Sequence, residues 1–299
     1  MGAWGAGLYS SDMAMDLKST IGAVARLPFD EPRLVEILRE THREVADDPT
    51  DEEHTVFWLV LADQFEKRAI ASAEVRVKAL AIIADGSDLR VQKELGLSGA
   101  DLRKRTAVLD DLQRRILAGP ETSKPRKVLR APQPYVLEEG GIYIYPTLRG
   151  QSINPYMGGR MFDRASWQPD GYGAMLIAER GRAFDYLAWY QPLVAAAGSR
   201  SRPNIAGLSR EARWVVAEPG TLTAAHYKRM ELERLDTIAL SKSKVAAVLG
   251  ERRPIIACAV ADISLSNAMT VGLSVPGLKG ITAASSTRTV LEGLGGLQD

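Results

Sequence analysis

A long stretch of alternating arginine and aromatic residues is the part of this sequence best suited to binding chemistry. Residues 147–171, TLRGQSINPYMGGRMFDRASWQPDG, contain Arg149, Tyr156, Arg160, Phe162, Arg164 and Trp167. Arginine and aromatic side chains are enriched at the energetic centres of protein interfaces, and the same mixture suits stacking on single-stranded RNA. We expect these six residues to bind a partner; the alternative is an ordered insertion whose aromatic side chains only pack onto their own domain.

A second basic segment follows in the same half of the chain. It contains Arg200, Arg202 and Arg210. Its composition resembles that of residues 147–171, so it is a further candidate for contact with an anionic partner.

Residues of the types used in metal binding and nucleophilic catalysis are scattered. His42, His54 and His226 lack HExxH or zinc-finger spacing. Cys258 lies in the apolar run IIACAVA, where a thiol behaves as an inert hydrophobic group, and no GxSxG motif marks a nucleophilic serine. The sequence therefore predicts no catalytic residue, no metal and no cofactor.

The opening segment MGAWGAGLYSSDMAMD combines closely spaced glycines with two aspartates. A phosphate-binding glycine loop follows a strand, and none precedes this segment, so we interpret Trp4 and the glycines as a structural anchor. Asp12 and Asp16 share one face of a predicted helix and could hold a metal. An acid directly after Ser10 and Ser11 is also typical of a helix N-terminus, and helix capping is the interpretation we adopt.

Residues 10–118, which precede these candidates, have the apolar period of helices. Four stripes predict helices that need partners: Leu34, Leu38 and Val45; Phe57, Leu61 and Phe65; Val75, Ala79 and Ile83; and Leu102, Leu109, Leu112 and Ile116. Thr50 with Glu53 predicts a capping box at one helix start, and Ser98 with Asp101 predicts a cap at another. Four or five short helices are expected to form a small bundle over residues 1–118.

A proline-rich, basic stretch divides the chain. Residues 119–134, GPETSKPRKVLRAPQP, hold four prolines, and proline disfavours helix at the residue before it. We predict a linker at 119–134 between a helical domain at 1–118 and a β-rich domain at 135–299.

The pattern after the linker is that of strands. Predicted strands are residues 142–145, 174–178, 183–190, 213–218, 254–260 and 269–275. Arg180-Gly181 is expected to form a hairpin turn, because glycine accepts a positive φ, and residues 241–250 are expected to be helical. The predicted fold class is α+β, with an N-terminal helical bundle followed by a β-rich, small-barrel-like domain.

The composition is that of an ordinary globular protein, with 45% hydrophobic and 25% charged residues. Residues 1–118 hold 16 basic and 21 acidic residues, whereas residues 119–299 hold 22 and 16. This asymmetry favours docking between the domains or a mildly anionic partner, and is too small to predict nucleic-acid binding by itself. A single cysteine, and no apolar run near the ~18 residues of a membrane span, predict a cytoplasmic protein without membrane association.

Two resemblances add to these expectations. Met1-Gly2-Ala3-Trp4-Gly5, followed by Gly7, Asp12, Ala14 and Asp16, resembles the start of the bacterial family known as domain of unknown function 4259, and residues 56–67 and 75–90 also resemble segments of that family. The resemblance covers roughly the first 115 residues. It implies a small helical domain in a bacterial protein, and it implies no activity.

The β-rich part is similar in pattern to the immunity protein 26 family. The residues that carry this resemblance are Gly141 to Pro146 (GIYIYP), YGAMLIAERG and FDYLAWY, over residues 136–250. Where that pattern has a short turn after the proline, this chain has the 25 residues 147–171. The resemblance implies a toxin-neutralising or partner-binding module on a small barrel.

Three functions follow as hypotheses. The first is a non-enzymatic, immunity or antitoxin-like factor of a bacterial conflict or defence system that binds a protein partner, such as a toxin, through the β-rich domain. The second is a nucleic-acid-binding defence module that uses residues 147–171. The third is an enzyme whose acid and base residues meet only in the fold.

Overall fold

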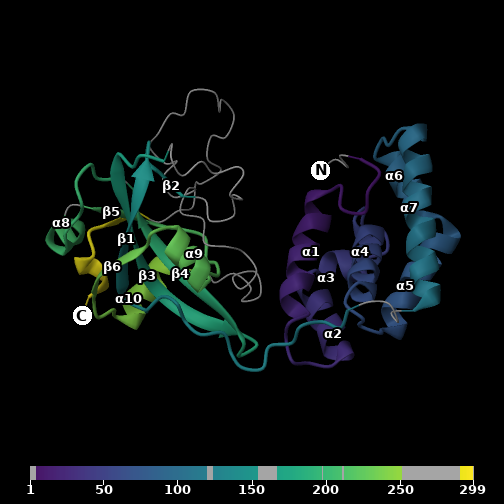
Figure 1. Ribbon diagram of the computed structural model, residues 1–299, viewed down its shortest axis with the longest axis horizontal. Coiled ribbons are helices and arrows are strands. Elements are labelled where there is room, and N and C mark those ends of the chain that lie inside the picture. Colours follow the sequence, from purple (N-terminus) through teal and green to yellow (C-terminus); the bar gives the residue numbers. More distant parts are fainter. Residues whose placement is uncertain are drawn as a thin grey trace. The chain divides into compact units, whose positions relative to one another are not determined.

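The computed structural model describes residues 5–119, 124–153, 167–196, 198–210, 212–250 and 290–298. The chain divides into two compact units, Met1–Ala131 and Pro132–Asp299, and the division falls inside the proline-rich stretch. We call them the helical unit and the β-unit. Figure 1 shows helices alone in the first and a curved sheet in the second, which confirms the predicted α+β fold class.

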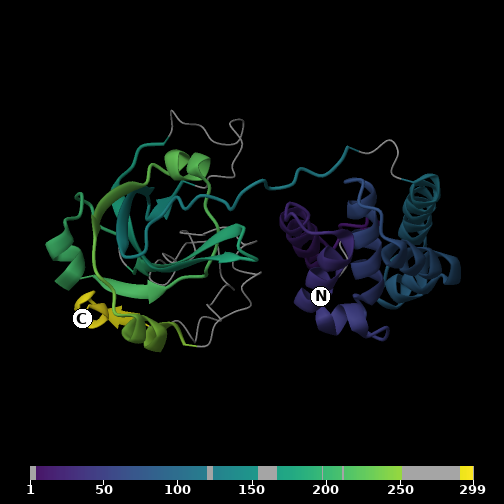
Figure 2. The same ribbon diagram turned by 90° about the horizontal axis from the view of Figure 1, so that it is seen from below.

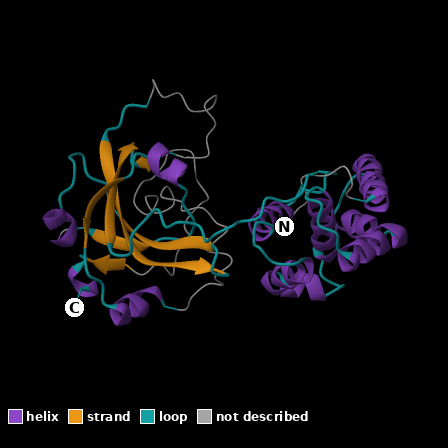
Figure 3. Cartoon of the chain, turned by 60° about the horizontal axis from the view of Figure 1, so that its bottom comes forward, coloured by secondary structure: helices purple, strands orange, loops and turns teal. Residues whose placement is uncertain are grey.

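The described residues of the helical unit form seven helices. They are α1 (Asp12–Val24), α2 (Glu31–Thr41), α3 (Arg43–Asp47), α4 (His54–Glu66), α5 (Ala73–Asp85), α6 (Ser87–Glu94) and α7 (Gly99–Ala118). The expected number of four or five was too small, because α3 and α6 have five and eight residues and are too short to show an apolar period. Figure 3 shows the helices of this unit as a bundle.

Helix α4 is the centre of the helical unit. Every one of its residues is buried, because α1, α3, α5, α6 and α7 all pack against it. Its residues 56–62, VFWLVLA, are apolar on every side rather than along one stripe, which is the pattern of a helix enclosed by others. Phe57 and Trp58 meet edge to face within it, with ring centroids 5.2 Å apart.

Two of the predicted helix starts are confirmed and one is wrong. The hydroxyls of Ser11 and Ser98 each accept a hydrogen bond, at 3.2 Å, from the backbone amide three residues further on. Thr50 does not cap α4, which begins at His54. The Thr50 hydroxyl donates instead to the Asp48 carboxylate at 2.7 Å. Aspartates in a loop compete for local hydrogen bonds in this way.

The β-unit is built on one antiparallel sheet. Its described strands are β1 (Gly141–Leu148), β2 (Gln151–Ser152), β3 (Gly171–Ala183), β4 (Leu187–Ala195), β5 (Arg213–Val216), β6 (Glu233–Thr237) and β7 (Val290–Glu292). The strand order is β2-β1-β3-β4-β5-β7, and β6 also pairs with β1. Seen from below, the strands curl into a half-barrel (Figure 2).

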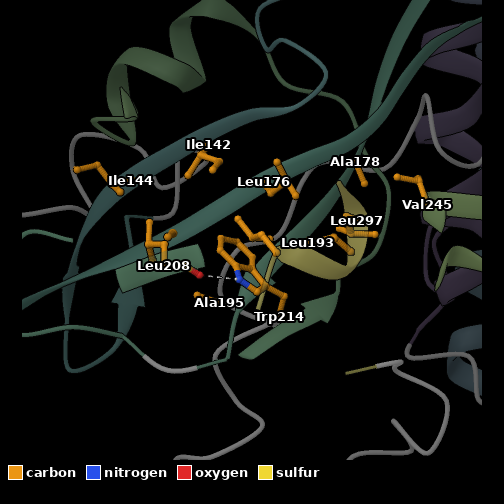
Figure 4. Close-up of a cluster of buried hydrophobic side chains, with 12 residues drawn as sticks. Ile142, Ile144, Leu176, Ala178, Leu193, Ala195, Leu208, Trp214, Val245 and Leu297 are labelled. Atoms are coloured by element: carbon orange, nitrogen blue, oxygen red, sulfur yellow. Dashed lines mark hydrogen bonds between the residues drawn. The ribbon is translucent and has the colours of Figure 1, made fainter. Parts of the chain in front are cut away.

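Apolar clusters cover both faces of this sheet. One face is rich in tyrosine and includes Tyr143, Tyr145 and Tyr190. The other surrounds Trp214, whose indole N–H donates to the Leu208 carbonyl at 3.3 Å (Figure 4). That second face is covered by α8 (Ile205–Arg210), α10 (Lys242–Leu249) and the 3₁₀ turn η2 (Gly295–Leu297). A short helix, α9 (Ala224–Arg229), precedes β6.

The hairpin between β3 and β4 differs from the prediction. The chain turns at Phe184 and Asp185, which have φ of 52° and 62°, and the predicted turn residues Arg180-Gly181 lie inside β3. The predicted strand 183–190 therefore begins only at Leu187. The turn was predicted from Gly181, but this glycine serves packing instead, because a Cβ there would lie 2.7 Å from the Trp189 ring.

The remaining strand and helix predictions have mixed outcomes. Strands β1 and β5 and helix α10 lie where the sequence pattern placed them. Residues 254–260 and 269–275, including Cys258, lie outside the described residues, and so does Trp4.

Candidate partner-binding rim

The long segment that follows β1 leaves and rejoins the sheet at one place. Arg149 and Gly150 form a two-residue turn with φ of 52° and 76°, so that β2 returns beside β1. The carboxylate of Asp170 accepts the backbone N–H of Arg149, with N–O distances of 2.9 and 3.1 Å. The N–H of Asp170 donates to the Thr147 carbonyl at 2.9 Å. These bonds tie the two ends of the segment together.

A second basic loop joins the same place through Ser199. The N–H of Tyr172 donates to the Ser199 carbonyl at 2.7 Å, and the N–H of Ser199 donates back to the Tyr172 carbonyl at 2.8 Å. Gly171 passes so close that a Cβ on it would lie 2.8 Å from the Ser199 carbonyl. Residues 198–202 therefore lie beside the base of the long segment, although the two are far apart in the sequence.

We define the arginine rim as residues 147–152, 167–172 and 198–202. Arg149, Arg200 and Arg202 are all exposed on it. Arg202 forms an ion pair with Glu233 at the start of β6. Neither Arg149 nor Arg200 has a carboxylate partner for its guanidinium group among the residues that the structure describes. Arg149 and Arg200 therefore present two exposed guanidinium groups at this end of the sheet.

The structure places two of the six predicted binding residues. Arg149 stands in the turn between β1 and β2 and is exposed, and Trp167 is half-buried just before β3. Tyr156, Arg160, Phe162 and Arg164 lie outside the described residues. Arg210, from the second basic segment, is exposed at the end of α8.

Three residues that organise the rim were not singled out from the sequence. Asp170 holds the Arg149 turn, Ser199 carries the bridge to β3, and Glu233 pairs with Arg202. The sequence shows that the loops of Arg149 and Arg200 are both basic. It does not show that they lie side by side, because their proximity depends on the single bridge between Tyr172 and Ser199, and one isolated bridge leaves no periodic pattern in a sequence.

The helical unit contains a buried ion pair that anchors the opening segment. Two guanidinium nitrogens of Arg105 donate to the two carboxylate oxygens of Asp88 at 2.9 and 2.8 Å. The third nitrogen of Arg105 donates to the Gly7 carbonyl at 2.7 Å, and Thr55 donates to Asp88 at 3.3 Å. Both charged groups are almost fully buried. The Gly7 carbonyl, in the opening segment, is thus held by a buried ion pair.

A second buried carboxylate, Asp63 in α4, has a larger set of donors. Lys67 and Arg115 approach it at 2.7 and 2.8 Å, and the Tyr9 hydroxyl also donates to it. Burial raises the pKa of Asp63, but the hydrogen bonds from Lys67, Tyr9 and Arg115 outweigh burial, and the pKa lies below its usual value. Burial beside this carboxylate also raises the pKa of Tyr9. The cluster ties the loop before α1 to α4 and α7.

The two histidines of the helical unit have different surroundings. His54 at the start of α4 bonds through Nδ1 to the Val45 carbonyl at 2.8 Å. His42 stacks at a tilt on Phe57, and burial lowers its pKa. Among the described residues, no group of three or more histidine, cysteine or acidic side chains is arranged to hold a metal ion.

Comparison of the chain with known proteins gives no match: no family model, no curated protein and no solved structure matches it. Of the helices that the structure describes, none combines the length and apolar character needed to cross a membrane.

Proposed function

We propose that the chain is a non-enzymatic binding protein, of the immunity or antitoxin-like kind, that recognises a protein partner through the arginine rim. The observation that carries this proposal is the backbone pairing of Tyr172 with Ser199, which brings two arginine-bearing loops to one end of a rigid sheet. Binding residues held in place before the encounter lose little conformational entropy when the partner docks.

The charges of the rim indicate the chemistry of the partner. Arg149 and Arg200 are exposed, and neither guanidinium has a carboxylate partner among the described residues. Arginine is suited to this task because its planar guanidinium can bind a carboxylate through two parallel hydrogen bonds. A partner with exposed carboxylates fits this surface.

Direct binding to the product of the neighbouring gene tests this proposal, because immunity factors are encoded beside their targets. The full chain, a variant with Arg149→Glu and Arg200→Glu, and two controls would be titrated against that protein by calorimetry. The controls, Lys242→Glu in α10 and Arg103→Glu in α7, reverse exposed charges that have no ion-pair partner in the described structure.

We expect the rim variant to bind at least about tenfold more weakly, since interface hot spots contribute more than ~1 kcal/mol each. The controls should bind like the unchanged chain. Equal binding by the rim variant would remove the rim from the interaction. If tagged chain from its native host captures no specific protein at any salt concentration, the proposal fails altogether.

A second candidate function is binding of single-stranded nucleic acid by the same rim. It is favoured by Tyr172 and Trp167, two partly exposed residues of the rim whose rings are of the kind that stacks on bases. Binding of this kind weakens steeply as salt increases, because counterions are released from the phosphates. Filter binding to single-stranded RNA and DNA at low salt checks it, and retention of neither nucleic acid would exclude it.

A further inference from the structure

The proline-rich stretch between the two units contains two segments, which we call the first and second arm, and each is bound to a different unit. The first arm, residues 124–129, is held by the helical unit. The Arg126 guanidinium donates to the carbonyls of Ala25 and Leu27 at 3.1 and 3.0 Å, and also to the Phe29 carbonyl. These carbonyls follow the end of α1, where backbone acceptors lack helical partners. The Arg126 side chain therefore supplies hydrogen-bond donors to free carbonyls after the end of α1, and this fixes the first arm.

Backbone hydrogen bonds extend this attachment along the first arm. The N–H of Arg126 donates to the Arg68 carbonyl at 3.0 Å, and the N–H of Leu129 donates to the Arg26 carbonyl at 2.7 Å. Arg126 is half-buried, and this burial lowers the pKa of its guanidinium. The first arm is thus part of the helical unit up to Leu129.

The second arm, residues 133–138, is held by the β-unit in a similar way. The N–H of Gln133 donates to the Tyr186 carbonyl at 2.9 Å, and its side-chain oxygen accepts the N–H of Ala188 at 3.0 Å. The Arg182 guanidinium donates to the Gln133 carbonyl at 3.1 Å. The tip of the β3–β4 hairpin therefore holds the start of this arm.

Aromatic contacts continue along the second arm. The guanidinium carbons of Arg180 and Arg182 lie 4.3 and 4.0 Å from the centroid of the Tyr135 ring, within the range of a cation–π contact. The hydroxyls of Tyr190 and Tyr143 accept the N–H groups of Val136 and Glu138 at 2.7 and 2.8 Å. The second arm is therefore part of the β-unit from Gln133 onward.

Three residues remain between the arms. Arg130, Ala131 and Pro132 are exposed, and none of them makes a hydrogen bond within the described structure. The division into compact units falls between Ala131 and Pro132. Proline fixes its own φ and restricts the residue before it to extended conformations. The freedom of this short stretch therefore lies mainly in the torsions of Arg130 and in the ψ angle of Pro132.

We propose that residues 119–134 do not act as a flexible linker over their whole length, and that the units reorient about a three-residue hinge, Arg130 to Pro132. Each arm moves with the unit that binds it. This inference rests on the contacts of the arms and is independent of the proposed function.

Amide hydrogen exchange on the full chain tests the hinge. Exchange should be slow at Arg126, Leu129, Gln133, Val136 and Glu138, whose N–H groups are bonded, and fast at Arg130 and Ala131. Uniformly fast exchange from residue 124 to 138 would show a flexible linker and overturn the proposal. Uniformly slow exchange would overturn it as well, because no hinge would then exist.

Limited trypsin digestion with a matched pair of variants provides a second test. In the unchanged chain, cleavage after Arg130 should be much faster than cleavage after Lys127. Arg126→Ala should accelerate cleavage after Lys127 by roughly tenfold or more, since loss of the three carbonyl contacts opens the arm locally. Val128→Ala, at an exposed position of the same arm, is the control and should leave the cleavage order unchanged. Cleavage after Lys127 as fast as after Arg130 in the unchanged chain would contradict the hinge.

Discussion

Tyr145 in β1 and Gly173 in β3 are paired across the sheet, and the tyrosine ring occupies the space that a side chain on Gly173 would need. The same arrangement recurs between Trp189 and Gly181, which are paired between β4 and β3. Large rings lying over glycines let neighbouring strands pack closely where the sheet curves. Tyr145 is 1% exposed, and its buried hydroxyl has no hydrogen-bond partner within the described structure.

Gly173→Ala is expected to destabilise the β-unit. The added Cβ would overlap the Tyr145 ring, and overpacking of this kind costs about 1–3 kcal/mol. Thermal or urea unfolding of the full chain measures the change. Gly295→Ala is the matched control, because a Cβ at that position of η2 meets nothing within 4 Å. Equal stability of the two variants would show that the ring moves aside freely.

Asp88→Ala is expected to destabilise the helical unit strongly. It would leave the buried Arg105 guanidinium without its carboxylate, and breaking one half of a buried pair costs about 3–5 kcal/mol. The double variant Asp88→Ala with Arg105→Met should recover part of this loss. Glu36→Ala, which breaks the exposed pair with Arg33, is the control and should leave stability almost unchanged, because solvent screens such pairs. Urea unfolding of all three variants decides whether burial sets the difference.

The stability of the helical unit should fall in acid in a way that depends on Asp63. Its pKa is lower in the folded chain than in the unfolded chain, so the stabilisation is complete above the unfolded value of about 4. It is lost as the pH falls through the folded value. Asp63→Asn should be less stable than the unchanged chain at neutral pH and should lose less stability between about pH 5 and pH 2. Unfolding free energies across this range provide the measurement, and parallel curves would be the contrary result.

Arg149→Gly should separate binding from stability at the rim. Arg149 has a φ of 52°, which glycine adopts without the strain that a Cβ brings. The variant should therefore unfold at an unchanged or slightly higher temperature, while it binds the partner more weakly because one exposed guanidinium is gone. A fall in both melting temperature and affinity would mean that the arginine side chain supports the fold.

Much of the framework could be predicted from the sequence. Three of the four apolar stripes lie within single helices, α4, α5 and α7, and the strand patterns located β1 and β5. The cap at Ser98 and the helix start at Asp12 are also as expected. The stripe of Leu34, Leu38 and Val45 was wrongly assigned to one helix, because Val45 lies in α3.

Turn chemistry was less reliable. Arg180-Gly181 has the composition of a turn but lies inside β3. Glycine stands there because the Trp189 ring occupies the space that a Cβ at position 181 would need.

The arrangement of the candidate site could be predicted only in part. Arg149 and Trp167 were recognised by composition, and composition also marked the loop of Arg200. Their common location depends on two backbone hydrogen bonds between Tyr172 and Ser199. Backbone groups are the same in every residue, so such a contact cannot be read from residue types.

The burial of α4 also has a consequence for synthesis of the chain on the ribosome. Residues 56–62 of this helix are apolar on every side, and α7, one of the helices that enclose it, is complete only at Ala118. A nascent chain that has released α4 but not α7 therefore exposes an apolar segment that is open to chaperones and to aggregation. A stop codon between the end of α4 and the end of α7 should leave a product that is degraded rather than one that folds in part.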